Sequence, residues 1–194
     1  LDRPGIGHAV VDPTDLEVLT DAIGPATRLV WLETISNPTT AMADISAIAA
    51  IAHERGVRVA VDNTFASPYL ATPLSSGADI VIHSTTKFLS GHGNSMGGVV
   101  VDSGRFDWSV SEKFRGLTDP EPAYHGLRFH ETFGDLAFTV SGHALGLRDL
   151  GATMAPMNAF LTITGIETLP LRMERHIANA QKVAAFLERH KAVS

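Results

Sequence analysis

The stretches VRVAVDNTF, at residues 57–65, and ADIVIHSTTKFLSGHG, at residues 78–93, decide the fold of this chain. Each contains a continuous apolar run, which is typical of a strand buried on both faces of a parallel sheet that lies between helices. Asp62 ends the first run, and Lys87 follows the second. Ligands bind beyond the carboxyl ends of such strands, so the two side chains are candidates for one site that binds an anionic, nitrogen-bearing cofactor.

Asp62 and Lys87 also have an ordinary structural interpretation. An aspartate after a strand is a common turn residue or helix cap, and most lysines are simply solvated. The two residues, taken by themselves, therefore leave both a functional and a structural role open.

The composition limits the class of protein. A chain of 194 residues, 44% of them hydrophobic, is long enough to bury one core. Its formal charge of -6 does not favour binding to nucleic acid. The absence of cysteine excludes disulfides and thiolate metal sites and suits a cytoplasmic protein. No apolar run approaches the roughly 20 residues that span a bilayer, and the opening residues do not resemble a signal peptide, so no membrane partner is expected.

The order of apolar patterns predicts the secondary structure. Short apolar runs predict strands at residues 9–11, 28–33, 57–61, 78–82 and 99–101. Amphipathic patterns predict helices at residues 14–23, 44–53, 106–114, 131–150, from Pro156 onward and at 170–191. The first helix would begin with a capping box of Thr14 and Glu17, and the second with Asp44 as its cap. The succession of strand, helix and strand predicts an α/β fold with a mostly parallel sheet flanked by helices.

Other motifs in the chain carry less functional information. Residues 115–134 contain several prolines and glycines and are expected to form a long connection, which is usually functional or mobile. The glycines of GHGNSMGG, at residues 91–98, do not fit a dinucleotide-binding loop because the third glycine is replaced by Met96 and a strand follows. No two histidines show the His-Glu-x-x-His spacing of a zinc protease, so no metal site is expected. The apolar stripe of the last helix is expected to be a packing face.

Three segments of the chain resemble a known family. They are ETISNP at residues 33–38, VDNTF at residues 61–65 and HSTTKF at residues 83–88. Asn37, Asp62 and Lys87 follow one another at intervals of 25 residues. In order and spacing these segments resemble the transsulfuration family of pyridoxal-phosphate enzymes of fold type I. The resemblance implies the large cofactor-binding domain of the aspartate-aminotransferase-like fold, present in part.

The resemblance also implies a role for each matching residue. Lys87 matches the lysine that holds pyridoxal 5'-phosphate as a Schiff base and later moves a proton. Asp62 matches the carboxylate at the pyridine nitrogen, and Ser84 and Thr86 match hydroxyls that contact the phosphate. Asn37 matches the asparagine near the cofactor's phenolic oxygen and the substrate carboxylate.

Four further segments are similar to the O-acetylhomoserine sulfhydrylase branch of that family, namely YHGLRFHETFG at 124–134, LRDLG at 147–151, PMNAFL at 156–161 and GIETLPLRMER at 165–175. This similarity implies a γ-replacement in which acetate leaves O-acetylhomoserine and sulfide enters to give homocysteine. A cystathionine γ-synthase or γ-lyase type of activity remains an alternative.

The resemblance covers only the middle of the family's pattern. Residues 1–168 would form a partial cofactor-binding domain, and residues 169–194 a long helix leading toward a C-terminal domain. The upstream phosphate-binding turn and the downstream arginine for the substrate carboxylate have no match in this sequence. The resemblance implies that the complete enzyme is a homo-oligomer, a dimer or tetramer. Because the phosphate-binding turn and the substrate arginine have no match here, we expect these 194 residues alone to be inactive. The alternative is that the chain is itself a folded but catalytically incompetent fragment of such an enzyme.

Overall fold

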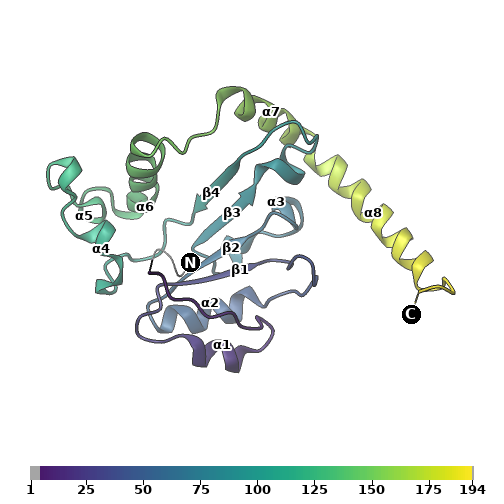
Figure 1. Ribbon diagram of the computed structural model, residues 1–194, viewed down its shortest axis with the longest axis horizontal. Helices are drawn as coiled ribbons and strands as arrows, with labels where there is room; N and C mark the ends of the chain where they lie inside the picture. The colour runs from purple at the N-terminus through teal and green to yellow at the C-terminus, as the bar shows by residue number, and fades with distance from the viewer. Residues whose placement is uncertain (1–4, 194) are drawn as a thin grey trace.

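The computed structural model describes residues 5–193 and contains one four-stranded sheet. Its strands are β1 (Leu29–Glu33), β2 (Arg58–Asp62), β3 (Ile80–Ser84) and β4 (Gly98–Asp102), in that order across the sheet (Figure 1). The first three strands are parallel and β4 runs antiparallel to β3. The predicted α/β fold with a mostly parallel sheet is therefore confirmed.

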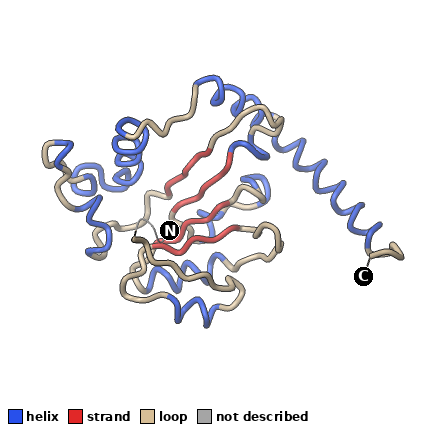
Figure 2. The backbone as a smooth tube through the Cα atoms, viewed as in Figure 1, coloured by secondary structure: helices blue, strands red, loops and turns tan. Residues whose placement is uncertain are grey.

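Helices α1 (Leu16–Ala22) and α2 (Ile45–Glu54) cover one face of the sheet (Figure 2). Val59, Val61 and Val81 point to that face and pack in one core cluster with residues of both helices. Alternate residues of a strand point to opposite faces. Ala60 and Ile80 consequently belong to a second cluster on the other face.

The second cluster is built around aromatic side chains. Trp108, Phe114 and Phe129 are each at most 5% exposed and pack against this face of the sheet. The indole of Trp108 contacts Phe114 edge to face, with ring centroids 5.4 Å apart. The Arg58 guanidinium lies 4.9 Å from both of these rings, and burial lowers its pKa. The short helices α4 (Arg115–Thr118), α5 (Phe129–Phe133) and α6 (Ala137–Ser141) surround the cluster.

The helix boundaries follow from capping residues. Asp44 caps α2 as predicted, since its carboxylate accepts a hydrogen bond from the Ala47 N–H. Gly56, at φ +58°, ends the same helix. The capping box predicted for α1 is wrong, because Asp15 caps that helix and Thr14 bonds to Asp12 instead.

The segments after β3 lie at the carboxyl edge of the parallel strands. A π-helical turn at Thr85–Leu89 follows β3, and α7 (Pro156–Glu167) and α8 (Leu169–Leu187) pack against it. Helix α8 then extends away from the sheet (Figure 1). Its first turns are buried at Leu169 and Met173, whereas Val183 and Phe186 farther along are mostly exposed. The packing face predicted for the last helix is thus covered only near its beginning.

Several predictions for the rest of the chain are wrong. Residues 9–11 form no strand, and residues 106–114 form turns with one short helical turn at Glu112–Phe114 instead of a helix. The long connection at 115–134 contains α4 and α5, and the helix predicted at 131–150 is interrupted. Gly134, at φ +53°, breaks it, and the aromatic cluster holds the short pieces in place. Among residues 5–193, no helix combines the length and the apolar character needed to cross a bilayer.

Candidate functional site

Asp62 and Ser84 lie at the carboxyl ends of two neighbouring parallel strands. Asp62 is the last residue of β2 and is paired in register with Ile82 of β3. Ser84 is two residues beyond Ile82, so its side chain lies on the same face of the sheet as that of Asp62. The structure therefore brings these two predicted site residues to one edge and one face.

A short chain of hydrogen bonds joins the two strand ends. One carboxylate oxygen of Asp62 accepts the Thr64 N–H at 2.9 Å. The Thr64 hydroxyl in turn accepts the Ser84 N–H at 2.7 Å. These bonds fix the Asp62 carboxylate relative to the start of the segment that carries Lys87.

Lys87 stands in the turn at Thr85–Leu89, directly after β3. Its backbone has φ −89° and ψ −120°, outside the helical region of the residues around it. Its side chain is exposed, and among the ion pairs within residues 5–193 none joins it to Asp62. The hydroxyl of the neighbouring Thr86 accepts the Gly97 N–H at 3.1 Å, which ties the turn to the start of β4.

Asn37 lies in the loop that follows β1, at the same edge. Its N–H donates to the Glu33 carboxylate at 2.7 Å, and Glu33 pairs in register with Asp62. Asn37 is exposed and Glu33 is half-buried. The glutamate thus orients the backbone of the loop in which Asn37 stands.

His83 is a buried titratable group at this edge that the sequence did not single out. It is 6% exposed, and its Nδ1 atom has no hydrogen-bond partner in the part of the chain that the structure describes. Burial lowers the pKa of the imidazole, and the negative charge of Asp62 opposes that shift. The negative charge of Asp62 therefore affects the pKa of the His83 imidazole.

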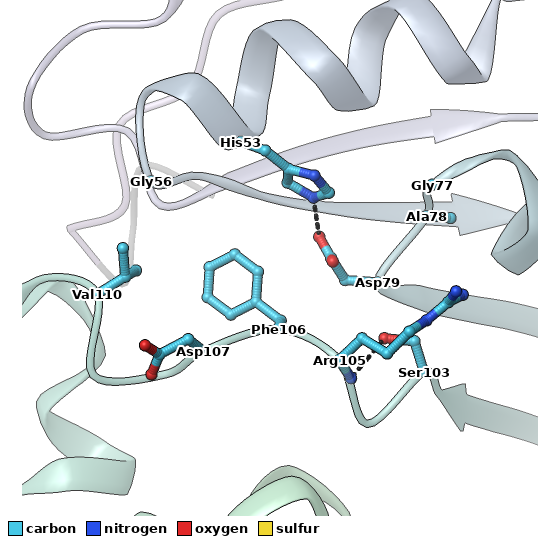
Figure 3. Close-up of a pocket in the computed structure, with 10 residues that line it drawn as sticks. All are labelled: His53, Gly56, Gly77, Ala78, Asp79, Ser103, Arg105, Phe106, Asp107 and Val110. Carbon is cyan, nitrogen blue, oxygen red and sulfur yellow. Dashed lines mark hydrogen bonds and ion pairs between the residues drawn. The ribbon is translucent and has the colours of Figure 1, made fainter.

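A crevice of about 380 Å³ lies at the opposite, amino edge of the strands (Figure 3). The Asp79 carboxylate on its wall accepts hydrogen bonds from His53 at 2.9 Å and from the Val59 N–H at 2.7 Å. Phe106 and Arg105 also line it. None of the predicted site residues lies in this crevice.

The groups at the carboxyl edge fit the cofactor that the sequence suggests. Within residues 5–193, the Lys87 amine, the Ser84 hydroxyl and the second carboxylate oxygen of Asp62 have no protein hydrogen-bond partner. An amine, a carboxylate and a hydroxyl donor are what a pyridoxal ring and its phosphate would engage. No group of three or more histidine, aspartate or glutamate side chains in the same described range could hold a metal ion.

Comparison with known proteins decides the family. The family model described as "Cys/Met metabolism PLP-dependent enzyme" matches residues 1–194. The chain belongs to this family. The three segments that suggested it, at residues 33–38, 61–65 and 83–88, are the ones that form the carboxyl edge described above.

Curated relatives within the family have high sequence identity to the chain. An O-acetyl-L-homoserine sulfhydrylase from Leptospira meyeri is 47% identical over 197 residues, which cover 97% of this chain and 44% of that protein. A homocysteine synthase from Schizosaccharomyces pombe is 45% identical over 196 residues, which cover 100% of this chain and 46% of that protein. The chain thus spans less than half the length of the curated relatives it matches.

Solved structures of family members share the fold. A putative O-acetylhomoserine (thiol)-lyase from Campylobacter jejuni, which carries N'-pyridoxyl-lysine-5'-monophosphate, is 36% identical with a TM-score of 0.86. The match covers 93% of this chain and 44% of that chain. A cystathionine gamma-lyase from Lactobacillus plantarum is 33% identical with a TM-score of 0.73, over 96% of this chain and 40% of that one.

Sequence reasoning named five site residues but not the hydrogen bonds and contacts that support them. Nothing in the sequence indicated that the Thr64 hydroxyl, two residues after Asp62, joins the two strand ends. His83 had the signal of ending an apolar run, but nothing in the run indicated that its ring is buried. Arg172, which contacts the turn of Lys87 from α8, gave no local signal.

Proposed function

We propose that the protein carrying this chain catalyses a pyridoxal-phosphate-dependent γ-replacement, converting O-acetylhomoserine and sulfide to homocysteine and acetate. The observation that supports it is the placement of Asp62 at the end of β2 and of Lys87 directly after the neighbouring parallel strand β3, in a chain 47% identical to an O-acetyl-L-homoserine sulfhydrylase. Because the chain spans less than half of such relatives, the activity is proposed for a protein of their length.

Each residue at the carboxyl edge would have a distinct task. Ser84 and Thr86 would donate hydroxyl hydrogen bonds to the cofactor's phosphate. Asp62 would accept a hydrogen bond from the protonated pyridine nitrogen and so keep it protonated, with the position of the carboxylate set by the Thr64 N–H. Asn37 would bind the substrate carboxylate and the cofactor's phenolic oxygen.

Lys87 would carry the chemistry. Its amine would hold the cofactor before the substrate binds and would then move the proton of the substrate's Cα. The bound cofactor supplies an electron sink that stabilises negative charge at the substrate carbon. The protein contributes mainly proton transfer and the positioning of groups that react with one another.

Replacing Lys87 tests this assignment. In the protein of full length we expect Lys87→Ala to abolish homocysteine formation and the yellow absorbance of the bound cofactor. Borohydride reduction of the unsubstituted protein, followed by peptide mass spectrometry, should place the reduced cofactor on the peptide that contains Lys87. Lys113→Ala, which removes a lysine that donates to the Arg55 carbonyl instead, is the matched control. An active, yellow Lys87→Ala protein would overturn the proposal.

A second candidate stays within the same chemistry. The cystathionine gamma-lyase from Lactobacillus plantarum shares the fold with a TM-score of 0.73, so a cystathionine γ-synthase or γ-lyase type of activity is the alternative. Turnover measured side by side with O-acetylhomoserine plus sulfide, with O-acetylhomoserine plus cysteine and with cystathionine separates these activities. Faster turnover with cysteine as the nucleophile, or of cystathionine, would favour the alternative.

We further propose how the chain fits into its complete protein. Residues 1–168 would form part of the cofactor-binding domain and residues 169–194 a helix toward a C-terminal domain, although residues 1–4 and 194 lie outside the described range. The protein would be a cytoplasmic homo-oligomer, a dimer or tetramer, with no nucleic-acid or membrane partner. Purified alone, the 194-residue chain would be inactive. Light scattering of the full-length protein and assays of both lengths test these statements.

A further inference from the structure

Arg172, on α8, contacts the backbone of the turn that carries Lys87. Its Nη1 atom donates to the Phe88 carbonyl at 2.9 Å, and its Nη2 atom lies 3.4 Å from the Leu89 carbonyl. These are the two carbonyls that directly follow Lys87 in the chain. The guanidinium therefore holds the turn from its C-terminal side.

The remaining donors of Arg172 bind the junction between α7 and α8. Nη2 also donates to the Gly165 carbonyl at 2.7 Å, and Nε donates to the Thr168 hydroxyl at 3.1 Å. One planar group thus joins the turn after β3 to the helix junction. Within residues 5–193 no carboxylate forms an ion pair with Arg172, so its partners are these carbonyls and one hydroxyl.

Gly91 provides the space in which the guanidinium lies. A Cβ atom at this position would be 2.2 Å from the Arg172 Nη1 atom. The Gly91 N–H also donates to the Lys87 carbonyl at 2.8 Å, and Gly91 adopts φ +75°. The residue that closes the turn of Lys87 is therefore also the one that admits Arg172.

Helix α7 approaches the same turn closely. A Cβ atom at Gly165 would lie 2.1 Å from the Ser90 carbonyl oxygen, so only glycine fits between the helix and the turn. The Phe88 ring lies 5.7 Å from the His176 ring of α8. The backbone of residues 88–91 is consequently held on several sides, with Arg172 making the polar contacts.

We propose that Arg172 is a positioning residue, whose guanidinium clamps the turn at residues 85–91 to the α7–α8 junction and so directs the Lys87 amine toward the edge of Asp62. The inference rests on the proposed role of Lys87. A lysine could not replace the arginine, because one ammonium cannot donate in the fork geometry that reaches Phe88 and Gly165 together. The non-helical backbone of Lys87 needs such outside support, since its neighbours alone would favour a regular turn.

Hydrogen exchange in the cofactor-free, full-length protein tests the clamp without relying on activity. We expect Arg172→Met to speed exchange in the peptide at residues 84–92 by about tenfold or more, while peptides of β1 and α2 stay unchanged. Arg175→Met, which alters an exposed arginine of the same helix, is the matched control and should change neither. Unchanged exchange at 84–92 in Arg172→Met, or an equal rise in every peptide, would overturn the proposal.

Kinetics of the loaded enzyme give the second measurement. Because a displaced lysine impairs proton transfer more than substrate binding, we expect Arg172→Met to lower kcat by about tenfold or more with KM changed by less than about twofold. Arg172→Lys should recover only part of the loss. Full recovery by lysine, or a change confined to KM, would contradict a clamp made by the guanidinium fork.

A pair of glycine variants separates displacement of Arg172 from backbone strain. Gly91→Ala and Gly93→Ala both place alanine at positive φ, +75° and +66°, but only the first collides with the guanidinium. Gly91→Ala should reproduce the exchange pattern of Arg172→Met, and Gly93→Ala should not. Equal effects of the two would count against the clamp. If Lys87→Ala stays active, the proposed function fails, whereas the exchange result still reports on the clamp by itself.

Discussion

Asp62 and Asp79 stand at opposite ends of the parallel strands and differ in how their carboxylates are used. Asp79 is 4% exposed, and its Oδ2 atom accepts hydrogen bonds from both His53 and the buried Val59 N–H. Asp62 is half-buried, and one of its carboxylate oxygens accepts the Thr64 N–H. The other oxygen has no protein donor in the described chain. A carboxylate that accepts hydrogen bonds from buried protein groups stabilises the fold, whereas a carboxylate with an unpaired oxygen can bind a ligand.

The crevice in the surface and the unpaired polar groups of the candidate site lie at opposite edges of the sheet. The crevice of about 380 Å³ lies beside Asp79, at the amino edge, where the charged groups already pair with one another. At the carboxyl edge, the Lys87 amine and the Ser84 hydroxyl lack protein partners in the range that the structure describes. The candidate site is therefore assigned from the unpaired polar groups and not from the crevice.

The same substitution at both aspartates gives the strongest test of this comparison. We expect Asp62→Asn to lower kcat on the order of 10²–10³-fold, because a neutral amide no longer stabilises the protonated pyridine nitrogen. Asp79→Asn should leave kcat within about twofold. Steady-state kinetics of the two purified full-length variants, with their cofactor absorbance, provide the measurement. Comparable losses of kcat in both variants would remove the functional distinction between the two edges.

In unfolding experiments, by contrast, we expect the substitution at Asp79 to have a larger effect than the one at Asp62. Asp79→Ala removes the acceptor of the buried Val59 N–H, and an unpaired buried donor costs about 1–3 kcal/mol in the free energy of unfolding. His53→Ala removes only a partner that is 40% exposed, so its cost should be at most about 1 kcal/mol. Urea unfolding of both variants and of Asp62→Ala gives the comparison. A larger loss for Asp62→Ala than for Asp79→Ala would show that Asp62 is a structural residue after all.

The elements around Asp62 could be predicted because local signals decide them. Continuous apolar runs that end at polar residues predict β1, β2 and β3, and the Asp44 cap predicts the start of α2. The region from 106 to 150 was predicted wrongly, because the packing of aromatic rings around Trp108 decides its short helices. Such contacts are tertiary, and no periodicity in the sequence reports them.

The residues of the candidate site also divide into those that local sequence signals predict and those that depend on tertiary contacts. The order of strands places Asp62, Ser84 and Lys87 at one edge, since parallel strands end at the same side of a sheet. Arg172 could not be found in this way, because its partner Phe88 is 84 residues distant and contributes a backbone carbonyl. Every residue has a backbone carbonyl, so a contact with a carbonyl cannot be predicted from the residue types in the sequence.

The smallest predicted effect concerns His83, which lies beside Asp62, and it appears only as a dependence of stability on pH. Burial lowers the pKa of His83 in the folded protein below its ordinary value of 6.5, so the unfolded chain binds the proton more readily. The free energy of unfolding should therefore fall as the pH drops below about 6.5 toward the folded-state pKa, and this part of the slope should vanish in His83→Gln. Asp62→Asn should steepen the slope, because the Asp62 charge opposes the lowering of the pKa. Urea unfolding between pH 7.5 and pH 5 tests both expectations; parallel curves for the unsubstituted protein and His83→Gln would contradict the buried, neutral histidine at the edge of Asp62.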